Sequence, residues 1–110
     1  MLRSRQDFAR LSERGRTRTH RLMVVHFMPN ALDHDRYGIS TGRRLGGAVQ
    51  RNRVRRRLRE ILRSSPHPGG QGWDMLIVAR PASVEVTFDE LRTALERLLA
   101  AVRASMTASL

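Results

Sequence analysis

Apolar residues between positions 51 and 63 recur at the spacing of one helix face. They fall at i, i+4, i+7 and i+8, the stripe of an amphipathic helix: Val54, Leu58, Ile61 and Leu62. The opposite face carries only polar side chains: Asn52, Arg55, Arg56, Arg59 and Arg63. The stretch holds seven Arg and one acid, Glu60, which is more positive charge than solvation of a helix requires. We therefore expect this segment, the arginine helix, to meet a fixed anionic partner such as a phosphate backbone.

The part of the chain before the arginine helix predicts one short helix and two strands. Residues 4–7 resemble a capping box, and Gly15 is placed to end the helix that they begin. Leu22 to Met28 is apolar and is followed by Pro29, which is typical of a strand that runs into a loop. Tyr37 to Thr41 alternates as a second strand. A basic turn with several glycines, residues 42–47, then leads into the arginine helix.

The part after the arginine helix predicts a buried strand and a long helix. Residues 64–72 contain two Pro and three Gly, which favours a flexible connection. Asp74 to Pro81 is a continuous apolar run that ends in proline, as expected for a strand buried on both faces at the centre of a sheet. Residues 87–90 form a capping box. They precede apolar residues at helical spacing: Leu91, Leu95, Leu98, Leu99 and Val102. Residues 104–110 lose this pattern, which predicts a frayed tail.

The order helix, strand, strand, helix, strand, helix describes an α/β or α+β sandwich in which helices cover a sheet. Of these we expect the α+β class, as a two-layer α/β sandwich. Three strands are clear from the pattern, and a short fourth one is compatible with Gly42 to Leu45. At 110 residues the chain is long enough for one domain, residues 1–110, and too short for two ordinary ones.

The charge of the chain is concentrated in two segments. The formal net charge is +11, of which residues 1–21 contribute +5 and residues 43–63 contribute +8. There is no cysteine, and the four histidines form no helical pair beside carboxylates, so we expect the protein to bind no metal or cofactor of its own. No run resembles a signal peptide or approaches the roughly 20 apolar residues of a membrane span, which predicts a cytoplasmic protein outside the membrane.

The segment Tyr37 to Glu60 resembles the signature of the bacterial ribonuclease P protein subunit, with Ala48-Val49-x-Arg51-Asn52-Arg53 at its core. The resemblance extends to Asp7-Phe8, Gly15, the strand at Leu22, and Asp74 to Pro81. It implies a four-stranded sheet with an unusual left-handed βαβ crossover, as in a domain of a small-subunit ribosomal protein. Ordinary crossovers have the opposite hand.

The resemblance also implies a function. In that family the protein partners a large catalytic RNA that removes the 5′ leader from precursor tRNA. The RNA holds the Mg²⁺ ions and performs the chemistry, so the protein has no catalytic residues. We expect one protein per ribonuclease P RNA, with precursor tRNA as the second partner.

Two sets of residues carry the family roles by position. The set expected to face the catalytic RNA is Arg43, Arg44, Arg51, Asn52, Arg53, Arg55, Arg56 and Arg59. The set expected to bind the leader, in a cleft between the first helix and the sheet, is Phe8, Val24 and His26. Family members often carry aromatics where this chain has Ser12 and His26, which predicts thinner stacking on the leader.

Structural roles compete with these assignments at three positions. A lone aromatic on a short helix usually belongs to the core, so Phe8 is open to both readings. Asn52 is also a favoured helix cap. Arg57, at the flank of the apolar stripe, is expected to be structural.

Other functions compatible with this size and charge are a ribosomal or other structural RNA-binding protein and a membrane-surface protein. A nuclease that acts without RNA would need clustered carboxylates to hold metal ions, whereas the acids here are scattered. The membrane reading is weakened by the lack of an aromatic anchor in the apolar stripe.

Overall fold

The computed structural model describes residues 5–64 and 72–108. Its elements in chain order are α1 (Arg5–Arg14), β1 (Arg16–Thr19), β2 (Met23–Pro29), β3 (Arg36–Ser40), η1 (Arg43–Leu45), α2 (Ala48–Ser64), β4 (Trp73–Ala79), η2 (Pro81–Val84) and α3 (Phe88–Ala108). The α+β prediction is confirmed, and the arginine helix, residues 51–63, makes up most of α2. The predicted capping residue Ser4 and most of the flexible connection lie outside the described residues.

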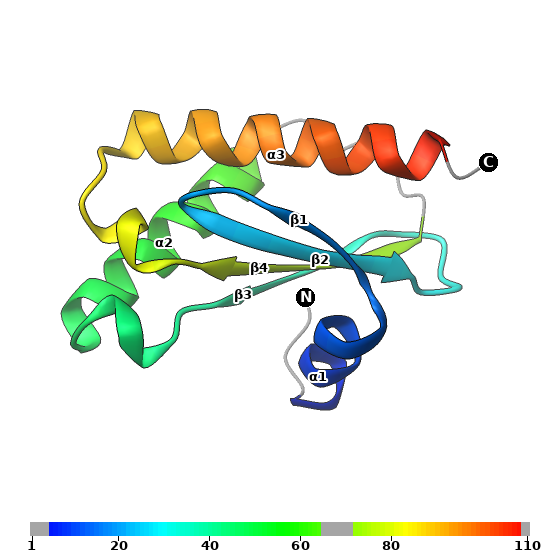
Figure 1. The fold of residues 1–110 in the computed structure, drawn as a ribbon, viewed down its shortest axis with the longest axis horizontal. Helices are drawn as coiled ribbons and strands as arrows, with labels where there is room; N and C mark the ends of the chain where they lie inside the picture. Colours follow the sequence, from blue (N-terminus) through cyan, green and yellow to red (C-terminus); the bar gives the residue numbers. More distant parts are fainter. Residues whose placement is uncertain (1–4, 65–71, 109–110) are drawn as a thin grey trace.

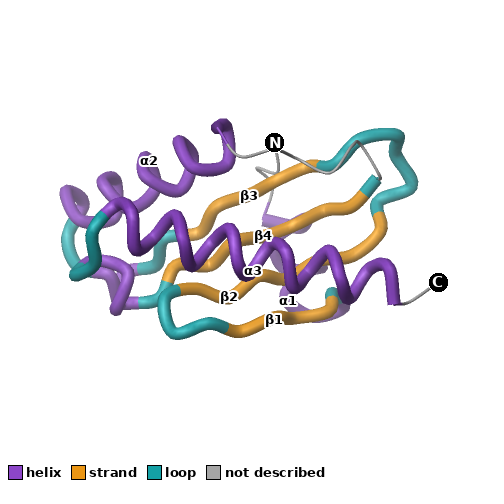
Figure 2. Tube along the Cα trace, turned by 90° about the horizontal axis from the view of Figure 1, so that it is seen from above, coloured by secondary structure: helices purple, strands orange, loops and turns teal. Residues whose placement is uncertain are grey.

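The four strands form one mixed sheet in the order β1-β2-β4-β3. β2 pairs antiparallel with both β1 and β4, whereas β3 and β4 are parallel neighbours. Parallel neighbours need a crossover, and α2 supplies it on the same side of the sheet as α3. In Figures 1 and 2 this β3-α2-β4 connection is left-handed, as the family resemblance implies.

Helices cover both faces of the sheet, but unequally. α2 and α3 lie on one face, and the short α1 lies on the other (Figure 1). The larger layer encloses a cluster with three fully buried leucines on the helices, Leu58, Leu91 and Leu95. A smaller cluster under α1 centres on Leu11 and Leu76. α1 therefore adds a partial third layer to the predicted two-layer sandwich.

β4 occupies the interior of the sheet, as its continuous apolar run predicts. Met75, Ile77 and Ala79 point into the larger cluster. Leu76 is buried under α1, and Val78 packs partly buried beside it. A strand with apolar contacts on both faces has no polar side to alternate with, which explains the unbroken pattern.

The fourth strand lies elsewhere than its possible position at Gly42 to Leu45. It is β1, Arg16–Thr19, whereas Arg43–Leu45 form a short 3₁₀ helix. All four residues of β1 are exposed at the sheet edge, so its sequence, Arg-Thr-Arg-Thr, carries no buried apolar position. An edge strand of this kind is held by backbone pairing to β2 and gives no hydrophobic signal.

The frayed tail predicted for residues 104–110 differs from the structure as far as Ala108, because α3 continues to that residue; residues 109 and 110 lie outside the described residues. Ser105 is 5% exposed, and its hydroxyl accepts a hydrogen bond from Arg18 Nε at 3.0 Å. A contact with β1 therefore holds this last part of the helix where the apolar repeat has ended. At the other end of α3, the predicted capping box is confirmed: Thr87 Oγ1 accepts a hydrogen bond from Glu90 N at 3.2 Å.

Candidate nucleic-acid interface

The position of α2 decides which arginines can meet a partner. The four residues of the predicted apolar stripe are all buried: Val54, Leu58, Ile61 and Leu62. They pack into the larger cluster below α3, so the opposite side of α2 faces outward. Arg56, Arg59 and Arg63 lie on that outward side and are exposed. Burial of one face of α2 therefore orients the arginines of the other face toward solvent.

A shallow hollow lies on this outward side of α2. Its volume is about 500 Å³, and it is lined by Val49, Asn52, Arg55, Arg56 and Arg59. Asn52 Oδ1 accepts a hydrogen bond from Arg55 Nη1 at 3.2 Å, which holds the two side chains together. Three guanidinium groups around one hollow provide planar donors that match phosphate oxygens.

Asn52 does not cap the helix. α2 begins at Ala48, and Gly47 O accepts the Arg51 N–H at 3.0 Å, so Asn52 lies inside the helix. The cap reading of this residue is wrong, because the helix starts one turn earlier than the apolar stripe indicates. Its amide is instead part of the outward polar face.

The arginines at the flanks of α2 are tied to the protein. On one flank, Arg55 Nη2 donates to Thr41 Oγ1 at 2.6 Å, beyond the end of β3. On the other flank, Arg53 Nη2 donates to Val84 O at 3.3 Å, and Arg57 Nη1 donates to Val86 O at 3.1 Å. The structural reading of Arg57 is confirmed. Arg53 is exposed and keeps further donors for a partner.

Arg51, at the start of α2, is less exposed than most of the predicted RNA-facing arginines. Its side chain is half-buried, and its Nε is buried with no hydrogen-bond partner in the described part of the chain. A guanidinium held in this way at the start of α2 presents only part of its donors outward.

Arg43 and Arg44 lie in η1, one turn before α2, and both are exposed. They line a second hollow of about 670 Å³ together with Ser40, Val78 and Arg80. The sequence pattern does not indicate a role for Arg80. Its only sequence signal is its place between the buried strand and Pro81. This hollow adjoins the sheet face that α1 leaves uncovered, since Ser40 and Val78 are register partners on that face.

The residues of the predicted leader cleft share the α1 side of the sheet. Val24 and His26 alternate with the core residues of β2 and are half-buried. Their register partners on the neighbouring strand β4 are Val78 and Leu76, respectively. Phe8 of α1 packs partly buried against the cluster that contains Leu76. The structure thus brings the three predicted residues to one face, and the core reading of Phe8 is confirmed in part. Ser12, one turn after Phe8, is exposed.

His26 contributes an uncharged ring to this face. Its Nδ1 lies 3.0 Å from Thr17 Oγ1 of the paired strand β1. Burial lowers the pKa of His26 below its usual value of 6.5. The lowered pKa favours the neutral ring at neutral pH, and a neutral ring suits stacking on a base better than pairing with a phosphate.

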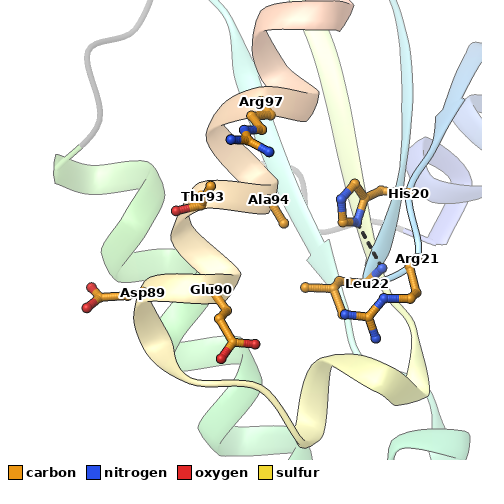
Figure 3. A pocket seen from close by; sticks show the side chains of 8 residues that line it. All are labelled: His20, Arg21, Leu22, Asp89, Glu90, Thr93, Ala94 and Arg97. Carbon is orange, nitrogen blue, oxygen red and sulfur yellow. Dashed lines mark hydrogen bonds between the residues drawn. The ribbon is translucent and has the colours of Figure 1, made fainter.

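A third hollow has a different character (Figure 3). It lies between the start of α3 and the turn from β1 to β2, and its volume is about 360 Å³. Asp89 and Glu90 line it beside Arg21 and Arg97. Its two carboxylates balance its two guanidinium groups, so this hollow lacks the excess of positive charge found in the hollow on α2.

Neither a metal centre nor a membrane span is found in the described ranges, 5–64 and 72–108. There, no three His, Asp or Glu side chains come together to hold a metal ion. No helix in these ranges is long and apolar enough to cross a bilayer.

Comparisons with known proteins place this geometry in a family. The sequence model of the family Ribonuclease P matches residues 1–103. The ribonuclease P protein component of Roseiflexus castenholzii is 39% identical over 99 residues, which cover 89% of this chain and 81% of that protein. The counterpart from Caldanaerobacter subterraneus is 38% identical over 98 residues, covering 89% and 84%.

Solved structures agree with the sequence relatives. The RNase P protein of Staphylococcus aureus superposes with a TM-score of 0.81 at 30% identity, covering 92% of this chain and 93% of that one. The RNase P protein of Thermotoga maritima gives a TM-score of 0.78 at 33% identity, covering 89% and 93%. The chain therefore belongs to the bacterial ribonuclease P protein family, the protein component of an RNA-catalysed endoribonuclease that processes tRNA.

Proposed function

We propose that this protein binds the ribonuclease P RNA through the outward face of α2 and the 5′ leader of precursor tRNA through the α1 side of the sheet. By holding both, it assists endonucleolytic removal of the leader to give the mature tRNA 5′ end. The observation that carries the proposal is the separation of the two faces of α2, one buried in the core and the other lined with arginine around a hollow.

The α2 surface is suited to an RNA backbone. Lys and Arg contacts to phosphate release counterions, and each contact contributes roughly −0.7 to −0.9 to the slope of log affinity against log salt. With about six arginines in contact, the slope is on the order of −4 to −5. The exposed members that support this number are Arg43, Arg44, Arg53, Arg56 and Arg59, with Arg55 half-buried beside them.

The α1 side of the sheet is suited to single-stranded RNA. An unpaired strand offers bases that stack on flat side chains and a backbone that basic groups can follow. Phe8 and His26 supply the flat groups, and the neighbouring hollow with Arg43, Arg44 and Arg80 supplies the charge. A single-stranded RNA bound in this way would run from α1 toward the arginines near the start of α2.

The protein supplies no catalytic group under this proposal. The RNA holds the Mg²⁺ and performs the hydrolysis, and one protein joins one RNA in the cytoplasm. The protein's share of the reaction is to neutralise phosphate charge and to position the substrate leader.

The test is cleavage of precursor tRNA by a bacterial ribonuclease P RNA at low, near-physiological magnesium, with and without the protein. Correct 5′ cleavage that depends on the protein, with no cleavage by protein alone, is the expected result. Absence of rescue with several such RNAs, together with co-sedimentation of the protein with ribosomes, would instead support a structural role in the ribosome.

A further inference from the structure

Val49 is the most exposed large apolar side chain noted in the described part of the chain. It is the second residue of α2 and is 79% exposed. Single exposed apolar residues are common on protein surfaces. Val49 differs because it sits in a surface that otherwise consists of charged and amide groups, where an arginine or glutamine would serve phosphate binding better. A β-branched residue is also a poor helix former at an exposed position.

The surroundings of Val49 restrict the kind of partner that covers it. Val49 lines the hollow of about 500 Å³ on α2, and the other residues of that hollow are Asn52, Arg55, Arg56 and Arg59. A partner that enters must be anionic around its edge and apolar at one point. A second copy of this chain is unsuitable because it carries the same positive charge, +11 overall. A purely phosphate-lined ridge of RNA is unsuitable as well, because it offers no apolar surface.

RNA offers both properties in specific places. The shallow minor groove of an A-form helix exposes ribose and base edges between two phosphate strands, and loops expose unstacked bases. We infer that Val49 packs against a ribose or base edge of the catalytic RNA while the arginines of the hollow hold the flanking phosphates. This inference rests on the proposed function and adds to it. It places the start of α2 in a minor groove or against a loop, where Val49 makes the apolar contact with the RNA.

Binding measurements at several salt concentrations separate an apolar contact from a charged one. The probe is a transcribed bacterial ribonuclease P RNA, with a structured RNA of equal length as the comparison. The variants are Val49→Ala, which removes two methyl groups, and Val49→Thr, which keeps the branched shape. Alanine is the better helix former, so the first variant is expected to fold. Arg59→Ala is the charged control, and Leu32→Ala changes a 43% exposed apolar residue outside α2.

Val49→Ala is expected to weaken ribonuclease P RNA binding about tenfold, or about 1.4 kcal/mol, at every salt concentration, since two buried methyl groups are lost. The salt slope should stay as in the wild type. Arg59→Ala should instead reduce the slope by about 0.7 to 0.9, and Leu32→Ala should change neither quantity. Val49→Thr should fall between wild type and Val49→Ala, because one methyl group remains.

Two results would overturn the inference. One is binding by Val49→Ala within twofold of the wild type, and the other is a reduced salt slope for this variant. Failure of the proposed function looks different: the wild-type protein itself would then bind ribonuclease P RNA no better than the comparison RNA. Circular dichroism of each variant shows whether α2 is intact, and Val49→Thr keeps the test decisive if Val49→Ala is misfolded.

Discussion

Buried Asp74 and half-buried Arg36 form a two-point ion pair across neighbouring parallel strands. Arg36 Nε donates to Asp74 Oδ1 at 2.8 Å, and Arg36 Nη2 donates to Oδ2 at 2.7 Å. The Asp74 side chain is fully buried, and Asn30 Nδ2 donates to it as well, at 2.8 Å. Arg10 of α1 lies 3.6 Å from the same carboxylate. One residue of β4 therefore joins β3, the loop after β2, and α1, which carries Phe8.

The pairing predicts how stability depends on pH. Burial alone would raise the pKa of Asp74, but the hydrogen bonds from Arg36 and Asn30 and the charges of Arg36 and Arg10 lower it below its usual value of 3.8. A lowered pKa in the folded state gives stability that is complete above 3.8 and is lost as the pH falls through the folded-state pKa. Asp74→Asn should lower the free energy of unfolding by about 2 kcal/mol at pH 7, since Arg36 loses its partner but still reaches solvent.

Urea unfolding of both proteins from pH 7 to pH 2.5 measures this difference. The gap between wild type and Asp74→Asn should begin to narrow as the pH falls below 3.8, where the unfolded chain takes up a proton at Asp74. It should close once the pH is below the lower folded-state pKa, where the folded wild-type carboxylate is also neutral. Glu85→Gln, a change at an exposed carboxylate, is the control and should give no such pattern. A gap that stays constant over the whole range would show that the charge of Asp74 is not the stabilising feature.

Gly15 fixes the distance between α1 and the sheet, and its replacement should be costly. A Cβ at this position would lie 2.5 Å from Leu11 O and 3.2 Å from Phe27 O, both backbone atoms that cannot move aside independently. Gly15→Ala should therefore destabilise the protein by about 1 to 3 kcal/mol. Gly42→Ala is the matched control, because a Cβ there meets nothing within 4 Å. Thermal unfolding of the two variants compares them, and equal midpoints would contradict the predicted clash.

The sequence predicts the fold wherever burial is strong. The stripe of α2, the repeat of α3 and the apolar run of β4 each place residues in the larger cluster, and their periods follow from that burial. The apolar pattern does not predict β1, because all residues of this strand are exposed. The pattern does not predict the end of α3 either, because a contact between Arg18 and Ser105, far apart in sequence, holds the last turns of this helix.

The site is predictable to a similar extent. The outward face of α2 follows directly from the position of its apolar stripe. The hydrogen bonds that tie Arg53 to the last residue of η2 and Arg57 to the backbone just after it do not follow, because sequence spacing says nothing of where residues 84 and 86 lie. The position of Arg80 does not follow from the sequence either. Arg80 lines the same hollow as Arg43 and Arg44 because β3 and β4, the strands that precede these residues, are parallel neighbours.

Arg56 and Arg57 are adjacent in sequence but should respond differently to removal. Arg57 Nη1 donates to Val86 O at 3.1 Å, whereas Arg56 is exposed in the α2 hollow. Arg57→Ala should lower the free energy of unfolding by about 1 kcal/mol and leave the salt slope of RNA binding unchanged. Arg56→Ala should lower the slope by about 0.7 to 0.9 and change stability by less than about 0.5 kcal/mol.

Chemical unfolding and binding titrations over a range of salt concentrations, run on both variants, check this contrast. Each variant is the control for the other, since the two changes remove the same type of side chain from neighbouring positions of one helix. A reduced slope for Arg57→Ala would place that residue in the RNA contact despite its backbone hydrogen bond.

Phe8 should distinguish substrates that differ only in the leader. Its ring packs against the small cluster of Leu11 and Leu76, so replacement by alanine would disturb this core as well as the surface. Phe8→Leu keeps most of the apolar volume and removes the flat ring. Base stacking on an aromatic side chain contributes roughly 1 to 3 kcal/mol, so the holoenzyme should bind precursor tRNA about tenfold more weakly. Its affinity for mature tRNA should stay unchanged, because mature tRNA has no leader.

The measurement is the affinity of the reconstituted holoenzyme for precursor and mature tRNA, with wild-type protein and with Phe8→Leu. The thermal midpoint of the free variant should remain within a few degrees of the wild type, which separates a surface effect from a loss of folding. Val24 and His26 lie on the same sheet face, so His26→Gln should also weaken binding of precursor tRNA and not of mature tRNA, by a smaller factor than Phe8→Leu. An equal loss of affinity for both tRNAs would mean that Phe8 acts only through the core, and the leader would then have to bind elsewhere on the protein.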